Sequence, residues 1–361
     1  MTIRGAQTSE SPLFDQPRHY DAVLVMSFGG PEGPDDVMPF LENVTRGRNI
    51  PRERLLQVAD HYQHFDGISP INRQNRELIA ALEQSLAARG PRLPVYFGNR
   101  NWHPFVTDTV ARMRDDGVKR AIAFVTAGFS CYSTCRQYRE DIVRAVEAVG
   151  AGAPEFDKLR VFYNHPGFID PSVEQLRTAL KQIPAEAGRR ERARVVFTAH
   201  SIPLAMAQTS AYERHFGEAA RLIAEGAGTN GRYLTAYQSR SGPPRVPWLE
   251  PDILDVLEDL ATQGVTDVVA HPIGFLSDHV EVLWDLDEEA RRKAASLGIT
   301  LVRAATVGPH PTFVEMIREL IVERTTANPE RRSLGKFGPN HDVCPVDCCR
   351  VGRVSDGPPT R

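Results

Sequence analysis

The sequence predicts an α/β protein of two similar doubly wound domains, each a four-stranded parallel sheet flanked by helices. Three observations lead to this fold class. The chain has 361 residues, and at about 150 residues per domain this length favours two domains. Short apolar, β-branched runs alternate along the chain with longer amphipathic segments. The short runs are almost continuously apolar, which is typical of strands that helices cover on both faces.

In the first half, the predicted strands are residues 22–28, 95–98, 121–126 and 161–163. The helices between them include residues 76–88 and 105–116. The earlier of these two helices carries four apolar side chains on one face, as a period of 3.6 residues requires. These are Leu78, Ile79, Leu82 and Leu86.

The second half repeats the pattern, with predicted strands at 194–199, 232–236, 267–271 and 300–303 and helices that include 212–225 and 253–263. The boundary between the halves is expected near 167–173, where Pro166, Gly167 and Pro171 interrupt the pattern. The chain then divides into a flexible N-terminus (1–18), a first domain (19–170), a second domain (171–327) and a cysteine-bearing tail (328–361).

Charge and hydropathy exclude two classes of protein. Lys and Arg number 43 against 46 Asp and Glu, a net charge of −3, so there is no global basic field for nucleic acid. No uninterrupted apolar run approaches the ~20 residues that a transmembrane helix needs. The polar N-terminus also lacks the apolar segment of a signal peptide. We therefore expect a cytoplasmic protein with no transmembrane segment and no nucleic-acid partner.

A histidine, His200, stands at the end of the predicted strand 194–199. Ligands of doubly wound folds sit at the carboxyl ends of strands. A neutral imidazole at this position can accept a proton or bind a metal. Position alone fits equally well a histidine that only hydrogen-bonds a loop.

Three carboxylates, Glu281, Asp285 and Glu289, follow the predicted strand 267–271 at a spacing of four residues. This spacing places them along one helical face. An exposed acidic row near a helix N-terminus would be tolerated by the helix dipole, but the apolar residues beside the row indicate partial burial. Carboxylates that are buried in a row need cations, so a path for a divalent metal is favoured. Oxygen ligands with one imidazole suit a borderline metal such as Fe²⁺.

A basic patch follows the first strand–helix unit and contains Arg46, Arg48, Arg52 and Arg54. Such charge runs usually form a solvated surface. The alternative is an anion clamp, because the guanidinium fork matches carboxylates. Just before the patch, Gly29 and Gly30 permit close approach of a flat ligand, although they do not form a dinucleotide-binding fingerprint.

The five cysteines fall into two groups, Cys131 with Cys135 and Cys344 with Cys348 and Cys349. In a reducing cytosol this odd number argues against structural disulfides and for a metal, a cluster or redox chemistry. Residues 328–361 otherwise have the composition of a disordered tail. Disordered tails are poor in cysteine, so three cysteines within six residues favour a structured role.

Five segments together resemble the ferrochelatase family: MSFGGP at 26–31, GISPI at 67–71, TAHSIP at 198–203, YQSR at 237–240 and DHVEVLWDLD at 278–287. The similarity extends from about Tyr20 to Glu323. It implies two Rossmann-like chelatase domains related by a pseudo-two-fold. It also implies an enzyme of haem biosynthesis that inserts Fe²⁺ into a porphyrin and releases two protons. His200 and Glu281 would be catalytic and face one another on the iron side of the macrocycle. Both would also belong, with Asp285 and Glu289, to the metal-binding set.

Within the family, the chain resembles the bacterial, cluster-bearing branch that acts on coproporphyrin III. The four propionates of this porphyrin need cationic or hydroxylic partners, and the resemblance places Arg46, Arg48, Ser69 and Tyr138 to supply them. Phe28 would also line the substrate site. In some relatives a tyrosine at this position ligates the product iron, whereas a phenyl ring has no ligating atom.

The cysteines complete the resemblance, because four thiolates hold a [2Fe–2S] cluster in part of the family. We expect Cys135, Cys344, Cys348 and Cys349 to be these ligands, with Cys131 as the alternative to Cys135. Inert thiols or a structural zinc would fit the same residues.

The other functions that remain open are a ferrochelatase acting on protoporphyrin IX, a cobalt or nickel tetrapyrrole chelatase, and a non-catalytic tetrapyrrole-binding protein. The partners implied are coproporphyrin III, Fe²⁺ and transient contacts with neighbouring haem-pathway enzymes.

Overall fold

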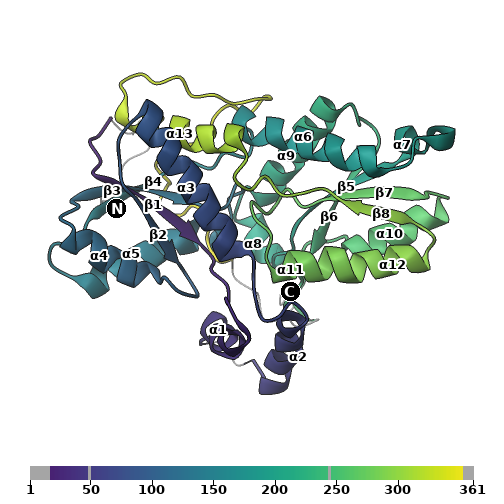
Figure 1. Cartoon of the computed structure of the whole chain (residues 1–361), viewed down its shortest axis with the longest axis horizontal. Helices are drawn as coiled ribbons and strands as arrows, with labels where there is room; N and C mark the ends of the chain where they lie inside the picture. The colour runs from purple at the N-terminus through teal and green to yellow at the C-terminus, as the bar shows by residue number, and fades with distance from the viewer. Residues whose placement is uncertain (1–16, 48–49, 243–244, 353–361) are drawn as a thin grey trace, which may run out of the picture.

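A computed structural model describes residues 17–47, 50–242 and 245–352. Arg48 and most of the expected N-terminal segment therefore lie outside the described residues. Two parallel sheets stand side by side, and a small lobe made by α1 (Val37–Val44) and α2 (Arg52–Gln63) projects beneath them (Figure 1). The predicted fold class, two four-stranded parallel sheets flanked by helices, is confirmed.

The first sheet has the strand order β2-β1-β3-β4, with all neighbours parallel. Its strands are β1 (Ala22–Ser27), β2 (Val95–Asn99), β3 (Arg120–Val125) and β4 (Glu155–Lys158). Side chains of β1 alternate between two apolar clusters, as the period of two residues requires. One cluster lies under α4 (Val106–Asp115) and α5 (Gln137–Val149), and the other under α3 (Ile71–Arg89) and α13 (Pro311–Thr325).

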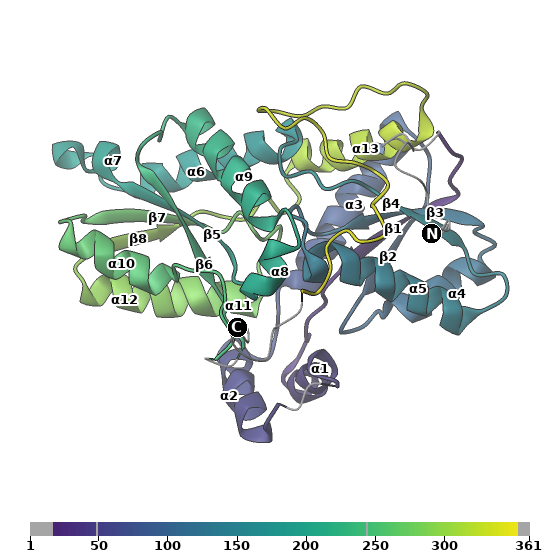
Figure 2. The same ribbon diagram turned by 180° about the vertical axis from the view of Figure 1, so that it is seen from behind.

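The second sheet has the order β6-β5-β7-β8, again all parallel, and so repeats the topology of the first. Its strands are β5 (Arg194–His200), β6 (Tyr233–Gln238), β7 (Asp267–His271) and β8 (Thr300–Arg303). One face is covered by α6 (Pro166–Gln182) and α9 (Tyr212–Ala227), and the other by α10 (Ile253–Thr262) and α12 (Arg291–Ser296) (Figure 2). The remaining helices are short: η1 (Pro34–Asp36), η2 (Tyr132–Arg136), η3 (Glu186–Gly188), α7 (Arg189–Arg192), α8 (Leu204–Gln208), α11 (Val280–Val282) and η4 (Leu283–Ala290).

One predicted strand is wrong. Residues 161–163 form no strand; the fourth strand is β4, whose sequence is EFDK. As an edge strand, β4 pairs only with β3 and can carry polar side chains. The apolar run at 161–163 is instead buried as a loop among helices, where Phe162 stacks on Phe124 with the ring centroids 5.5 Å apart.

The chain passes between the sheets through helices. The expected boundary at 167–173 lies inside α6, where Pro166 occupies the first turn and therefore breaks no hydrogen bond. After β8, the chain returns to the first sheet as α13, which packs against α3. The ring of Phe313 on α13 lies 6.4 Å from that of Phe124 on β3. Each sheet is thus covered in part by a helix that follows the last strand of the other.

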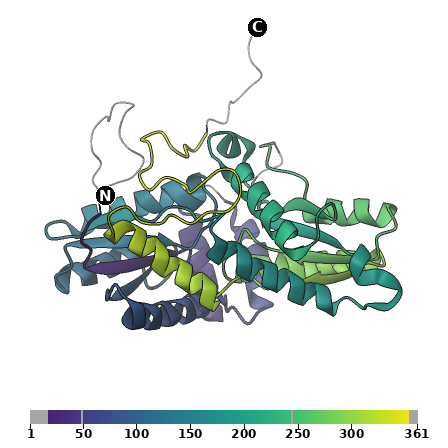
Figure 3. The ribbon, with the colours of Figure 1, turned by 90° about the horizontal axis from the view of Figure 1, so that it is seen from above.

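The tail after α13 contains no helix or strand in its described part, 326–352, and passes over the middle of the molecule (Figure 3). A buried charge network holds it. The Arg160 guanidinium donates to both carboxylate oxygens of Glu323 and to the Arg332 carbonyl of the tail, at 2.7, 2.8 and 3.0 Å. Arg331 of the tail lies 3.6 Å from Glu323, and Asp342 lies 3.8 Å from Arg324. Within the described ranges, no helix combines the length and apolar character needed to cross a membrane.

Candidate active site

The fold brings His200 and Glu281 together. β5 ends at His200, and Glu281 lies on α11, which follows the neighbouring strand β7. Because parallel strands share one carboxyl edge, their following residues meet there. The Nε2 atom of His200 lies 3.6 Å from Oε2 of Glu281, and the two side chains are 34% and 43% exposed. Both groups are therefore accessible to a ligand from the same side.

A second histidine, His279, stands behind this pair. Its Nδ1 lies 4.0 Å from Oε2 of Glu281, and its ring packs against Phe275 at a centroid distance of 4.9 Å. Burial lowers the pKa of His279, and the negative charge of Glu281 opposes this shift. The sequence analysis gave this residue no role; its only signal was its position two residues before Glu281.

The acidic row does not lie on one α-helix, as the spacing suggested: Glu281 is on the short α11, and Asp285 and Glu289 are on the π-helix η4 that follows it. The row still shares one face, because the charges of both Glu281 and Glu289 act on Asp285. Asp285 accepts hydrogen bonds from Ser239 Oγ and, at 3.3 Å, from Gln238 Nε2 at the end of β6. Burial raises the pKa of Asp285 to about 7, against the lowering effect of the Ser239 hydrogen bond. Single π turns inside helices are frequent at functional sites.

This raised pKa predicts a pH-dependent stability. Below the ordinary carboxyl pKa of 3.8, Asp285 is protonated in both folded and unfolded chains; between 3.8 and about 7 the folded chain binds more protons. The stabilising contribution is therefore lost as pH rises through about 7. Asp285→Asn stays neutral throughout. We expect the Tm of the wild type, relative to this variant in metal-free buffer, to fall as the pH is raised from about 5 to about 8. Asp259→Asn, at an exposed site on α10, is the control, and parallel Tm curves for wild type and Asp285→Asn would contradict the prediction.

The small lobe reaches across to η4. The ring of His61 on α2 stacks on Trp284 with centroids 3.9 Å apart, and His64 Nε2 lies 3.3 Å from Glu288 Oε1. Phe28 packs into the apolar cluster that joins α1 and α2 to Val280 beside Glu281. The lobe and the π-helix are therefore in direct contact beside the candidate site.

The expected propionate partners are placed very differently. Arg46 is exposed just after α1, as a propionate clamp would need. Ser69 and Tyr138 are only 3% and 5% exposed. Ser69 packs directly against Gly30: a Cβ added to Gly30 would lie only 2.7 Å from the Cβ of Ser69. Burial raises the pKa of Tyr138, and the Arg100 guanidinium covers its ring at 3.7 Å from the centroid. The contacts of these residues with substrate stay predictions.

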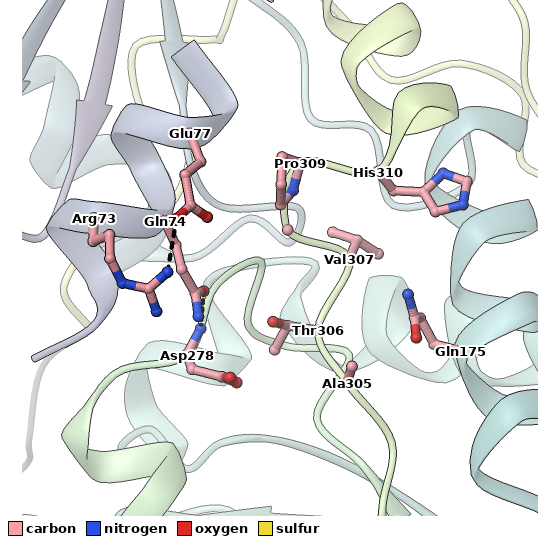
Figure 4. A pocket seen from close by; sticks show the side chains of 11 residues that line it. Arg73, Gln74, Glu77, Gln175, Asp278, Ala305, Thr306, Val307, Pro309 and His310 are labelled. Atoms are coloured by element: carbon pink, nitrogen blue, oxygen red, sulfur yellow. Dashed lines mark hydrogen bonds and ion pairs between the residues drawn. The ribbon is translucent and has the colours of Figure 1, made fainter. Parts of the chain in front are cut away.

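The start of the acidic motif is anchored by both halves of the molecule. The backbone N–H of Asp278 donates to Gln74 Oε1 on α3 at 2.8 Å, while the Asp278 carboxylate pairs with Arg303 on β8 at 2.9 Å. Asp278 also borders a pocket of about 340 Å³ between α3 and the loop that follows β8 (Figure 4). This double anchoring fixes the segment that carries His279 and Glu281.

The cysteines gather at a second place, where the tail meets η2. Cys135 lies close enough to Cys344 and Cys349 to shift the pKa of both, and the Sγ atoms of Cys348 and Cys349 are 3.5 Å apart. The hydrogen bond from Cys135 lowers the pKa of Cys344, and hydrogen bonds from Cys344 and Cys349 lower that of Cys348. Four cysteines thus converge, and the thiolate form of cysteine is the one that binds metal.

Cys131 does not join this group. Its Sγ lies 3.2 Å from the hydroxyls of both Ser133 and Thr134, and burial raises its pKa. His341, which the sequence analysis did not single out, does join it: His341, Cys344 and Cys348 each place one ligand atom within 4.8 Å of the others. The spacing of three residues between His341 and Cys344 was the available signal.

Comparison with known proteins agrees with these features. A sequence model of the ferrochelatase family matches residues 20–325. The chain is 54% identical over 331 residues to a ferrochelatase of Rhodopirellula baltica, with 91% of this chain and 93% of that protein covered. It is 52% identical over 345 residues to the coproporphyrin III ferrochelatase of Nocardia farcinica, with coverage of 92% and 97%. A protein of the same name from Mycolicibacterium smegmatis is 53% identical over 319 residues, with coverage of 88% and 93%.

Proposed function

The chain belongs to the ferrochelatase family, and we propose that it inserts Fe²⁺ into coproporphyrin III to give Fe-coproporphyrin III and two protons. The observation that carries this proposal is the pair His200 and Glu281, 3.6 Å apart and both partly exposed at the carboxyl edge of the second sheet. An acid–base group and a carboxylate at one open position meet the two needs of the reaction, removal of protons and approach of a cation.

The chemistry is an exchange of protons for metal. Two pyrrole N–H groups of the porphyrin lose their protons, and Fe²⁺ takes the nitrogen lone pairs. His200 accepts a proton through Nε2, which faces Glu281. Glu281 either takes the second proton or contacts the incoming iron. His279, whose side chain is only 20% exposed, lies against Glu281 and limits the directions that its carboxylate can adopt.

The row Glu281, Asp285 and Glu289 supplies a route between the site and the surface. Asp285 has a pKa of about 7, so near neutral pH it exchanges a proton readily. Together with His200 the row offers imidazole and carboxylate ligands, which suit Fe²⁺. We propose that iron moves inward, or protons move outward, along this row of carboxylates on α11 and η4.

The preference for coproporphyrin III rests on two supports. The relatives from Nocardia farcinica and Mycolicibacterium smegmatis are named as coproporphyrin III ferrochelatases. Arg46 is exposed at the end of α1, where its guanidinium can meet a carboxylate. Protoporphyrin IX has two propionates fewer, so we expect its binding to depend less on Arg46.

An anaerobic assay with Fe²⁺ and the two porphyrins side by side tests the proposal, with loss of porphyrin fluorescence as the readout. We expect a higher kcat/KM for coproporphyrin III, and an Arg46→Ala variant that raises KM for coproporphyrin III more than for protoporphyrin IX. A higher kcat/KM for protoporphyrin IX would show that the chain is a ferrochelatase that acts on protoporphyrin IX. Turnover of Co²⁺ or Ni²⁺ with a corrin precursor, or binding of metalloporphyrin without turnover, would assign the remaining alternatives.

We also propose that Cys135, Cys344, Cys348 and Cys349 hold a [2Fe–2S] cluster. The donor set fits: the four cysteines converge, their neighbours lower the pKa of Cys344 and Cys348, and four thiolates are the usual ligands of such a cluster. When bound, the cluster would supply an electron-transfer centre. Arg136 donates to the carbonyls of Val346 and Cys348 at 3.1 and 3.2 Å, and so holds the tail cysteines beside Cys135.

A further inference from the structure

The segment that carries His200 is fixed on one side by the second domain itself. The Ser201 hydroxyl donates to the Leu249 carbonyl at 2.8 Å, and the Leu204 N–H donates to the Pro247 carbonyl at 2.9 Å. These bonds secure the residues after His200. The carbonyl of His200 and the outer face of the following helix, α8, are held by other residues.

A buried tyrosine secures the carbonyl. Tyr212, at the start of α9, is 2% exposed, and its hydroxyl donates to the His200 carbonyl at 2.9 Å. Its ring packs edge-on against Phe129 with centroids 6.0 Å apart. The phenol ring is therefore locked by packing, and its hydroxyl presents one donor at a fixed position to the backbone of the proposed proton acceptor.

The tail secures the outer face. Thr209, directly after α8, donates from Oγ1 to the Arg350 carbonyl at 2.6 Å. Gly352 adopts a φ of +80°, and a Cβ there would overlap the carbonyl of Ala205 on α8. Residues 350–352 thus pack against α8, which begins at Leu204. They follow directly on Cys348 and Cys349.

We propose that Tyr212 is a positioning residue for His200, and that residues 350–352 of the tail hold the same segment from outside, so that the tail is part of the catalytic apparatus. This inference rests on the proposed role of His200. A displaced α8 and a free His200 carbonyl would let the imidazole leave its position 3.6 Å from Glu281. Among the described residues, neither Tyr212 nor residues 350–352 hydrogen-bond Arg46, Ser69 or Tyr138, so turnover would suffer while binding would not.

The first test is Tyr212→Phe, which keeps the packed ring and removes only the hydroxyl. We expect kcat to fall roughly 3- to 10-fold, the effect of about one hydrogen bond, with KM for coproporphyrin III unchanged. Tyr96→Phe is the matched control, because it removes a hydroxyl that bonds Asp116 at 2.8 Å in the first sheet; its kcat should equal that of the wild type. In a His200→Ala background, Tyr212→Phe should have no further effect, because it acts through the imidazole.

The second test compares two tail glycines of similar backbone conformation. Gly352→Ala forces the tail off α8, whereas Gly338 has a φ of +66° and nothing near its missing Cβ. We expect a lower kcat for Gly352→Ala only, at equal iron content of the two proteins. Thr209→Val, which leaves the tail backbone unchanged, should lower kcat in the same direction.

The outcomes separate this inference from the proposed function. Full turnover by His200→Ala would remove His200 from the mechanism. An inactive His200→Ala together with wild-type kcat in Tyr212→Phe and Thr209→Val would overturn the positioning role. Equal kcat losses in Gly352→Ala and Gly338→Ala would overturn the contribution of the tail.

Discussion

His200→Ala is expected to lower kcat for iron insertion by roughly 10²–10⁴-fold, the usual cost of losing one positioned acid–base group. The side chain stands at the end of β5 and is 34% exposed, so its truncation creates no cavity in the core. The Tm should therefore stay close to that of the wild type. Loss of coproporphyrin III fluorescence under anaerobic conditions measures the rate, and a folded variant with normal kcat would refute the assignment.

Glu281→Gln should cause a loss of the same order, since the amide keeps the size of the side chain and removes its charge. Glu258→Gln is the matched control, because Glu258 pairs with Lys293 on the outer surface of the second domain and contacts no part of the site. A loss of activity in both variants would point to a general effect of charge. A loss only in Glu281→Gln would connect the carboxylate with the proton or the metal.

The strands show what periodicity can predict and where it stops. β7 and β8 have the predicted bounds because each follows a turn at a glycine, Gly264 or Gly298, and has an apolar centre. β4 was missed because an edge strand pairs on one side and tolerates Glu, Asp and Lys. The run 161–163 was mistaken for a strand because burial by helices selects the same apolar residues as burial in a sheet.

The site could be predicted only in part, for a similar reason. The closeness of His200 and Glu281 could be predicted because a motif marks them and because carboxyl ends of parallel strands converge; their catalytic roles stay predictions. The π-helix under Asp285 was not predictable, since a spacing of four residues fits both helix types. Tyr212 acts through a single hydroxyl on a backbone carbonyl, and such a contact depends on tertiary packing that leaves no local pattern in the sequence.

The cysteine site gives the second large expected effect. Protein purified anaerobically should be brown and contain about two irons and two labile sulfides per chain, the composition of one [2Fe–2S] cluster. Cys135→Ser should bleach it, because Cys135 contacts both Cys344 and Cys349. Cys131→Ser should stay brown, because the Cys131 thiol is engaged with Ser133 and Thr134. Reversed results would assign the internal ligand to Cys131, and a colourless protein with one zinc would replace the cluster by a structural metal.

Loss of the cluster should also release the tail from the body of the protein, but only after Asp342. The residues before it are held by charges that need no metal: Arg331 lies 3.6 Å from Glu323 of α13, and Asp342 lies 3.8 Å from Arg324 of the same helix. The residues after it depend on the converging thiols and on the carbonyl contacts of Arg136. Limited proteolysis of Cys348→Ser should therefore cut within 343–352 and spare 331–342, with Cys131→Ser as the resistant control. Cleavage that begins upstream of Asp342 would mean that the cysteine site, rather than the charge network, holds the whole tail to the catalytic body.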